Sequence, residues 1–277
     1  MREISNLEIE VYNWNVDPSE RIVSSSTSKG NQQKWRKDGY FLKADNMGYE
    51  GLAECLASEL AHYTNIGDFA SITDYYLCTI IDGSNRFKGC MSKSFLKAGE
   101  TLLTLQQIMD LYMEKGIRKK LSRMSSTEKI ELIVNRVVEI TGLKNFGEWL
   151  TALLEFDKLI LNEDRHMNNI AIVASEDGKY RLMSLFDNGL SFCSDTARDY
   201  PMQRPLMSCI KAVKAKPFNV SFGKQVEACR NLYGRQLKVN ISSNEINTFV
   251  FDKIDIYSKE ICKRVLNILL YQLKHVL

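Results

Sequence analysis

The chain has 277 residues, 44% of them hydrophobic, which is enough to bury the core of one large domain or of two modest lobes. Its net charge of +3 is too mild to indicate a nucleic-acid-binding protein from bulk electrostatics. The seven cysteines are scattered and never form C-x-x-C, which argues against a disulfide framework or zinc site and favours a reducing compartment. With neither a signal-peptide pattern nor a membrane-length apolar stretch, we expect a cytoplasmic protein without a membrane partner; secretion without a cleaved signal stays open.

The first part of the chain predicts a small antiparallel sheet with one helix. An apolar stripe predicts the helix over residues 49–63. Because the pattern turns helical from Gly99, we place a connector between two lobes near residues 90–99, with Met91 and Phe95 expected in the core rather than as walls of a binding site. Alternating or β-branched segments indicate strands within residues 1–23, near 33–35, at 40–44, at 69–81 and at 87–92.

The rest of the chain is predicted to be mainly helical. Residues 190–224 follow no regular pattern, and helices are expected after them at 222–234 and 244–276. Capping patterns at Thr104, Ser125 and Asn145 precede apolar-periodic runs and predict helices at 108–113, 130–140 and 149–161. The irregular segment holds a basic group that suits either a phosphate or acidic substrate or a merely solvated surface: Arg198, Arg204, Lys211, Lys214 and Lys216.

The strongest chemical signal is a polar loop with a hairpin behind it. Asp164 and Asn169 stand five residues apart in the loop NEDRHMNN, and Asp187 returns after two short strands that are predicted to turn at Asp177-Gly178. Carboxylate and amide oxygens are ligands for Mg²⁺, and a further carboxylate can orient a hydroxyl and accept its proton. These three side chains therefore predict Mg²⁺-assisted phosphoryl transfer.

The residue order in this loop resembles one family of kinases. The common protein kinases place His-Arg before the acid, whereas here the basic pair follows it, as Asp164-Arg165-His166. The longer pattern D-x-L-I-x-N-x-D-R-H-x-x-N, from Asp157 to Asn169, resembles that of the bacterial HipA-like serine/threonine kinases. Phosphoinositide kinases share the shorter D-R-H-x-x-N.

Further matches to the HipA-like family lie nearer the N-terminus. Lys43 ends a strand that resembles the one carrying the family's ATP lysine. Both Glu54 and Glu59 qualify as the helix glutamate that pairs with this lysine, and the family's spacing favours Glu54. The family's phosphate loop, G-x-Q-x-K, is matched by Gly30, Gln32 and Lys34.

The resemblance implies an α+β, bilobal, protein-kinase-like fold with ATP and Mg²⁺ as cofactors. A small antiparallel-sheet N-lobe would span residues 1–95, and a larger, mainly helical C-lobe would span residues 96–277. Asp164 would then be the general base, while Asn169 and Asp187 would hold the metal ion.

The remaining loop residues are expected to support this site. Arg165, next to Asp164, would favour the ionised form of that carboxylate. His166 is predicted to brace the site near Asp187 rather than to act as a base.

The implied activity is a protein serine/threonine kinase that phosphorylates itself. In this family a serine three residues before the loop glycine is autophosphorylated, and the matching residue here is Thr27, with Ser28 beside it. The expected partners are ATP and a protein with a Ser or Thr acceptor, with no nucleic acid as a primary partner. Because only about twenty residues precede the loop, we do not expect the antitoxin-binding N-terminal domain of larger members.

Two other functions stay open from the sequence. A small-molecule or phosphoinositide kinase would share the D-R-H-x-x-N loop, because the choice of acceptor lies outside it. A pseudokinase would use the same cleft only as a binding module. Pseudokinases usually lack at least one residue of the catalytic set. Here the whole set is present: Lys43, Asp164, Asn169 and Asp187.

Overall fold

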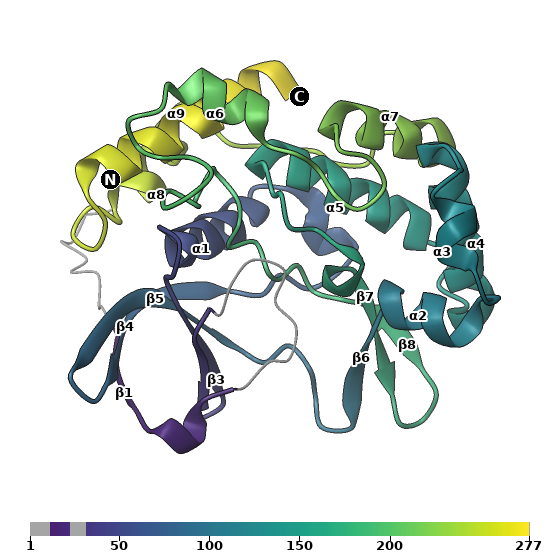
Figure 1. Cartoon of the computed structure of the whole chain (residues 1–277), viewed down its shortest axis with the longest axis horizontal. Helices are drawn as coiled ribbons and strands as arrows, with labels where there is room; N and C mark the ends of the chain where they lie inside the picture. Colours follow the sequence, from purple (N-terminus) through teal and green to yellow (C-terminus); the bar gives the residue numbers. More distant parts are fainter. Residues whose placement is uncertain (1–11, 23–31, 277) are drawn as a thin grey trace, which may run out of the picture.

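A computed structural model of the chain describes residues 12–22 and 32–276, which form two lobes joined by residues 94–99 (Figure 1). The N-terminal lobe holds a five-stranded sheet in the order β1-β4-β5-β3-β2 and one long helix, α1. The C-terminal lobe holds a three-stranded sheet and the other α-helices of the described residues. The arrangement is α+β in two lobes, as the sequence predicts.

The N-terminal sheet is mixed, so the expectation of a wholly antiparallel sheet is wrong at one edge. There β1 pairs with β4 in parallel. Because β2, β3 and α1 separate these two strands in the sequence, no tight hairpin forces antiparallel pairing. The strands are β1 (Tyr12–Val16), β2 (Lys34–Lys37), β3 (Tyr40–Ala44), β4 (Tyr75–Asp82) and β5 (Asn85–Lys93).

The strand expected at residues 69–81 starts later than predicted. A short 3-10 helix, η2 (Asn65–Asp68), precedes it, and β4 begins only at Tyr75. Phe69 and Ile72 instead pack on the main hydrophobic core, where Ile72 forms a single parallel bridge with Leu185. Phe69 and Ile72 therefore pack between the lobes, while the later residues of the predicted segment form β4.

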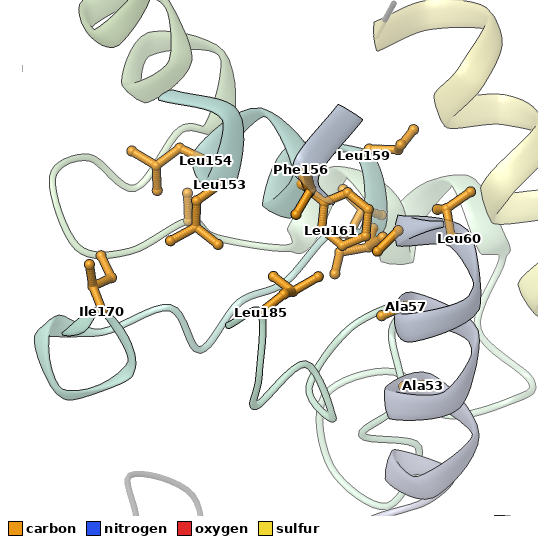
Figure 2. Close-up of a cluster of buried hydrophobic side chains, with 14 of the residues drawn as sticks. Ala53, Ala57, Leu60, Leu153, Leu154, Phe156, Leu159, Leu161, Ile170 and Leu185 are labelled. Carbon is orange, nitrogen blue, oxygen red and sulfur yellow. The ribbon is translucent and has the colours of Figure 1, made fainter. Parts of the chain in front are cut away.

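Helix α1 (Glu50–Ala61) packs on the N-terminal sheet and also belongs to the core of the C-terminal lobe. Its Leu60 lies in one apolar cluster with Phe156 of α5 (Phe146–Ile160) (Figure 2). On the sheet side the backbones approach closely, because a Cβ at Gly51 would lie 2.7 Å from the Gly89 backbone of β5. The position of α1 thus depends on both lobes.

The C-terminal lobe begins with a strand where a helix was expected. The segment after Gly99 forms β6 (Glu100–Thr104), which pairs antiparallel with β7 (Ala171–Ser175). β7 in turn pairs with β8 (Tyr180–Leu182) through the turn predicted at Asp177-Gly178, which is confirmed. The partner of β6 lies far away in the sequence, so the local pattern after Gly99 could not reveal the pairing.

Most of the predicted helices form, with differences at their ends. The capping boxes at Thr104 and Ser125 are confirmed. Asn145 does not cap α5, because its backbone is not in the extended conformation that lets a side chain reach the first turn. The helices are α2 (Leu105–Tyr112), α3 (Ile117–Leu121), α4 (Ser126–Thr141), α6 (Leu206–Ala212), α7 (Phe222–Tyr233), α8 (Ser243–Phe251) and α9 (Lys259–Val276).

Two predictions for the last third of the chain are corrected. The segment 190–224 is not wholly irregular, because it contains α6, and the helix expected over 244–276 is broken into α8 and α9. Among the helices of the described residues, none combines the length and apolar character that crossing a membrane requires.

The break between α8 and α9 contacts the N-terminal lobe. Tyr257 donates a hydrogen bond of 2.8 Å to the Asp45 carboxylate, whose other oxygen accepts from the Gly51 N–H at the start of α1. Near the end of α1, Lys253 forms an ion pair of 3.2 Å with Glu59. The C-terminal helices are thereby attached to both ends of α1.

The buried carboxyl of Asp45 should make the free energy of unfolding depend on pH. Burial raises the pKa of its carboxyl from 3.8 to about 7. Because this folded-state pKa lies above the unfolded value, the folded protein loses stability as the pH rises from about 4 to about 7. The variant D45N keeps a hydrogen-bonding side chain but does not titrate.

We therefore expect the free energy of unfolding of the wild type, relative to D45N, to fall by about 2 kcal/mol between about pH 5 and about pH 8. Urea unfolding of both proteins at both pH values measures this difference. The same pH dependence in the two proteins would contradict the assignment to Asp45.

Candidate active site

A lysine with little exposure connects the two lobes. Lys43 Nζ on β3 lies 2.6 Å from Glu54 Oε1 on α1 and 2.9 Å from Asp187 Oδ1 in the C-terminal lobe. Glu54 is 1% exposed, and its second oxygen accepts a hydrogen bond from the Asn188 N–H. Glu59, the other candidate, pairs with Lys253 instead. Of the two glutamates, Glu54 is therefore the partner of Lys43.

Cationic side chains keep the Asp187 carboxylate ionised. Burial alone would raise the pKa of Asp187, but Lys43 and Lys34 outweigh burial and hold the pKa well below its ordinary value. Burial alone would likewise lower the pKa of Lys43, but Asp187 and Glu54 raise it well above its ordinary value. Lys34 stands opposite Lys43 in the β2–β3 ladder, and its pKa is lowered by burial and by Lys43. The site thus places two ammonium groups near the Asp187 carboxylate, and Glu54 is the second carboxylate of the cluster.

The backbone of Asp187 is strained. Its φ of +57° lies in the left-handed region, which costs a residue with a side chain about 1 kcal/mol or more. In this conformation Asp187 reaches Lys43 of the N-terminal lobe while Asn188 accepts a hydrogen bond from Arg165 in the C-terminal lobe. Such strain persists where the surrounding contacts enforce it, as they do here.

Asp164 lies in a braced loop that follows α5. Its N–H donates to Asn162 Oδ1 at 3.0 Å, and its carbonyl accepts from the Asn169 side-chain amide at 3.0 Å. Asn169 ends the 3-10 helix η3 (Met167–Asn169). The Asp164 carboxylate forms an ion pair with Lys216, whose Nζ lies 2.8 Å from Oδ1. The structure therefore brings the predicted acid and amide together on a fixed backbone.

Arg165 corrects a prediction, because its side chain does not lie against the Asp164 carboxylate. It is fully buried and forms a two-pronged ion pair with Asp157 of α5, with Nε 2.9 Å from Oδ2 and Nη2 3.0 Å from Oδ1. A buried guanidinium needs a hydrogen-bond acceptor for its N–H donors, and here the acceptors lie beneath the loop of Asp164. Its remaining bonds go to the carbonyl oxygens of Asn169 and Phe186 and to the amide oxygen of Asn188.

His166 also differs from its prediction. Its Nδ1 accepts a hydrogen bond from the Asn168 N–H at 3.2 Å, and its Nε2 lies 3.8 Å from Asp164 Oδ2. These contacts place His166 beside Asp164, not beside Asp187. The ring caps η3 and flanks the loop acid.

A cavity of about 340 Å³ opens beside Lys43 and Asp187. Phe95 of the connector and Phe186 line it, with ring centroids 5.5 Å apart. Phe95 is thus a wall of the cavity as well as a core neighbour, whereas Met91 packs in the small core of the N-terminal sheet.

Of the predicted phosphate loop, the structure describes Gln32 and Lys34. The Gln32 side chain donates to the Ala44 carbonyl at 3.1 Å, and Lys34 lines the cavity. Gly30 and the candidate phosphorylation residues Thr27 and Ser28 lie outside the described residues.

For Phe186 and Thr73 the sequence predicted no role, and Lys216 was predicted only as one of the basic group in the segment 190–224. Phe186 and Thr73 line the cavity, and Lys216 pairs with Asp164. Thr73 and Phe186 had no motif to mark them. The sequence did contain a sign that Lys216 is held in place, because Ala215 and Phe218 near it are apolar. Both of these residues are buried in the structure. A segment anchored by such neighbours is not merely a solvated surface.

The side chains fit a magnesium nucleoside triphosphate. The described residues hold no cluster of three or more His, Cys, Asp or Glu that could bind an ion unaided. That suits Mg²⁺, which usually takes one or two protein carboxylates and completes its shell with phosphate and water oxygens. Thr73 Oγ1 is buried without a hydrogen-bond partner among the described residues. Phe95 and Phe186 give the cavity an aromatic lining, which suits a purine base.

Comparison with known proteins identifies the fold. The crystal structure of the Helicobacter pylori proinflammatory kinase CtkA is similar to this chain, with a TM-score of 0.62 and 15% sequence identity over 95% of this chain and 94% of that chain. At this identity the similarity establishes a bilobal, kinase-like α+β fold, and no more. No family model matches the sequence, and no curated protein matches it at a significant level.

The buried ion pair predicts a structural role for Arg165. R165M leaves the Asp157 carboxylate buried without its counter-charge, so we expect a loss of about 3 kcal/mol in the free energy of unfolding. The double variant D157L/R165M buries no charge and should recover part of this loss. Urea unfolding measures both. R198M, at an exposed arginine, is the control and should change stability by less than about 0.5 kcal/mol. Wild-type stability in R165M would contradict the prediction.

Proposed function

We propose that the chain is an ATP- and Mg²⁺-dependent serine/threonine protein kinase of the HipA-like type. The observation that carries the proposal is the position of Lys43 Nζ, 2.6 Å from Glu54 and 2.9 Å from Asp187, beside a cavity of about 340 Å³. Protein kinases require a lysine paired with a helix glutamate, together with an acid that can hold the metal ion, and Lys43 lies beside both kinds of carboxylate.

Each residue of the site would have a separate role in phosphoryl transfer. Mg-ATP, when bound, supplies the γ-phosphoryl group and the metal charge that neutralises the phosphates. Asn169 and Asp187 offer oxygen ligands for the ion, and Lys43, with Lys34 behind it, offers positive charge for the phosphates. Asp164 orients the acceptor hydroxyl and takes its proton as the new oxygen–phosphorus bond forms and the bond to the ADP oxygen breaks.

The walls of the cavity favour a nucleotide over a smaller phosphate donor. Phe95 and Phe186 provide two aromatic faces against which an adenine ring can pack. Ser92 at the end of β5 and the connector residues Ser94 and Leu96 line the same cavity. Thr73 also lines the cavity, and its hydroxyl is buried without a hydrogen-bond partner among the described residues.

A protein acceptor is proposed from the resemblance of the Asp157 to Asn169 pattern to the HipA-like serine/threonine kinases. Kinases of lipids and metabolites share only its shorter part. The fold and the Lys43 cluster are common to all of these classes, so the choice of acceptor is tested rather than inferred from them.

The first test follows label from γ-labelled ATP with Mg²⁺, using the purified protein alone and with a generic protein acceptor. We expect label on serine or threonine. D164N and D187N should each reduce transfer by about 10²-fold or more, because each removes a carboxylate of the reaction centre. D177N, in the exposed hairpin turn, is the control and should transfer normally.

Two outcomes would overturn the proposal. Label on a lipid or metabolite acceptor and none on protein would indicate a small-molecule kinase. Nucleotide binding without transfer to any acceptor would indicate a binding module. In a labelled protein, phosphopeptide mapping should find phosphate within Ser24 to Ser28, with Thr27 and Ser28 as the expected sites.

The two glutamates of α1 provide a matched pair of variants. E54Q weakens the hold on Lys43, so we expect kcat/KM for ATP to fall by about 10- to 100-fold. E59Q removes only a partly exposed ion pair with Lys253 and should keep kcat/KM within about twofold of the wild type. Steady-state kinetics compare the two, and equal losses would contradict a specific role for Glu54.

A further inference from the structure

Lys216 comes from a segment far from the catalytic loop and yet reaches its acid. Its Nζ lies 2.8 Å from Asp164 Oδ1, across 52 positions of sequence. The Lys216 side chain is 39% exposed, and that of Asp164 is 14% exposed. The ammonium is therefore partly exposed while it holds Asp164, so it can meet a bound molecule without leaving that carboxylate.

The backbone around Lys216 is held by buried contacts. Gln225 of α7 is fully buried, and its side chain donates to the Lys216 carbonyl at 3.0 Å and accepts from the Phe218 N–H at 2.9 Å. Ser126, in the first turn of α4, donates to the Phe218 carbonyl at 3.2 Å. Two helices thus fix the base of a flexible side chain, as precise placement of an active-site group requires.

The catalytic loop itself does not provide this charge. The Arg165 guanidinium is buried against Asp157, beneath the loop. His166 uses Nδ1 to accept from Asn168, and its Nε2 is 3.8 Å from Asp164, farther away than the Lys216 ammonium. Phosphoryl transfer needs fixed positive charge where the negative charge moves between acceptor, phosphorus and leaving oxygen.

We propose that Lys216 is an additional catalytic residue, whose ammonium bridges the Asp164 carboxylate and the terminal phosphate of a bound nucleoside triphosphate. This assignment rests on the proposed kinase function. Lys216 neither gives nor takes a proton in the step. The hydroxyl proton goes to Asp164, the acceptor oxygen bonds to the γ-phosphorus, and the bond from that phosphorus to the departing ADP oxygen breaks. Lys216 keeps Asp164 in place and stabilises the charge on the transferred group.

The test uses K216M, which keeps much of the stem but removes the charge, and K216R, which keeps a charge. K214M, two residues earlier and exposed, is the matched control. We expect K216M to lower kcat by about 10²-fold with a smaller change in the KM for ATP, and K216R to recover part of the loss. K214M should stay within about twofold of the wild type.

A second readout does not depend on turnover. Isothermal titration with Mg²⁺ compares the affinity for a non-hydrolysable ATP analogue with that for ADP, which lacks the terminal phosphate. In K216M the ratio of the two affinities should fall by about tenfold, because a charge-assisted contact with the terminal phosphate is missing. The affinity for ADP should stay unchanged. K214M should keep the full preference.

The outcomes separate this assignment from the proposed function. A wild type that neither binds nucleotide nor transfers label refutes the kinase function itself. If the wild type does both and K216M matches K214M, only the assignment of Lys216 fails. Lost turnover with an unchanged preference for the triphosphate also refutes the phosphate contact. Circular dichroism checks folding, and if K216M does not fold, K216Q is measured in its place.

Discussion

The candidate site depends on one buried ion pair, between Arg165 and Asp157. The guanidinium has no exposure to water, so its donors must find partners within the protein. Those partners come from separate parts of the chain: Asp157 on α5, the carbonyls of Asn169 and Phe186, and the side chain of Asn188. A single side chain therefore fixes helix α5, the loop of Asp164 and the segment of Asp187 relative to one another.

Asn188 extends this network into the other lobe. Its side chain accepts from Arg165, while its N–H donates to Glu54, which also binds Lys43. The left-handed backbone of Asp187 is the point at which the two sets of contacts meet. The strain there is sustained because the bonds on both sides would be lost if the backbone relaxed. The geometry of the carboxylate and the junction of the lobes are thus one structural feature.

The sequence predicts those parts of the fold that are encoded locally. The Asp177-Gly178 turn and the capping boxes at Thr104 and Ser125 depend on a few adjacent residues, and all are confirmed. The parallel pairing of β1 and the contact of Lys216 with Asp164 join segments far apart in the chain, so no local pattern contains them. Arg165 was misplaced for a different reason: adjacency in sequence does not mean contact, and its side chain is directed beneath the loop while the Asp164 carboxylate meets Lys216.

The same contacts determine where the geometry of the candidate site can be altered. Helix α1 is packed between the N-terminal sheet and the C-terminal lobe, with almost no space at Gly51 and a hydrogen bond from Tyr257 to Asp45 beside its first turn. Displacing α1 to separate Glu54 from Lys43 would open a packed core, which is costly. The Lys216 side chain is instead partly exposed while it holds Asp164. Moving that side chain disturbs no core, so a bound substrate or partner can alter the site there at a lower cost in free energy.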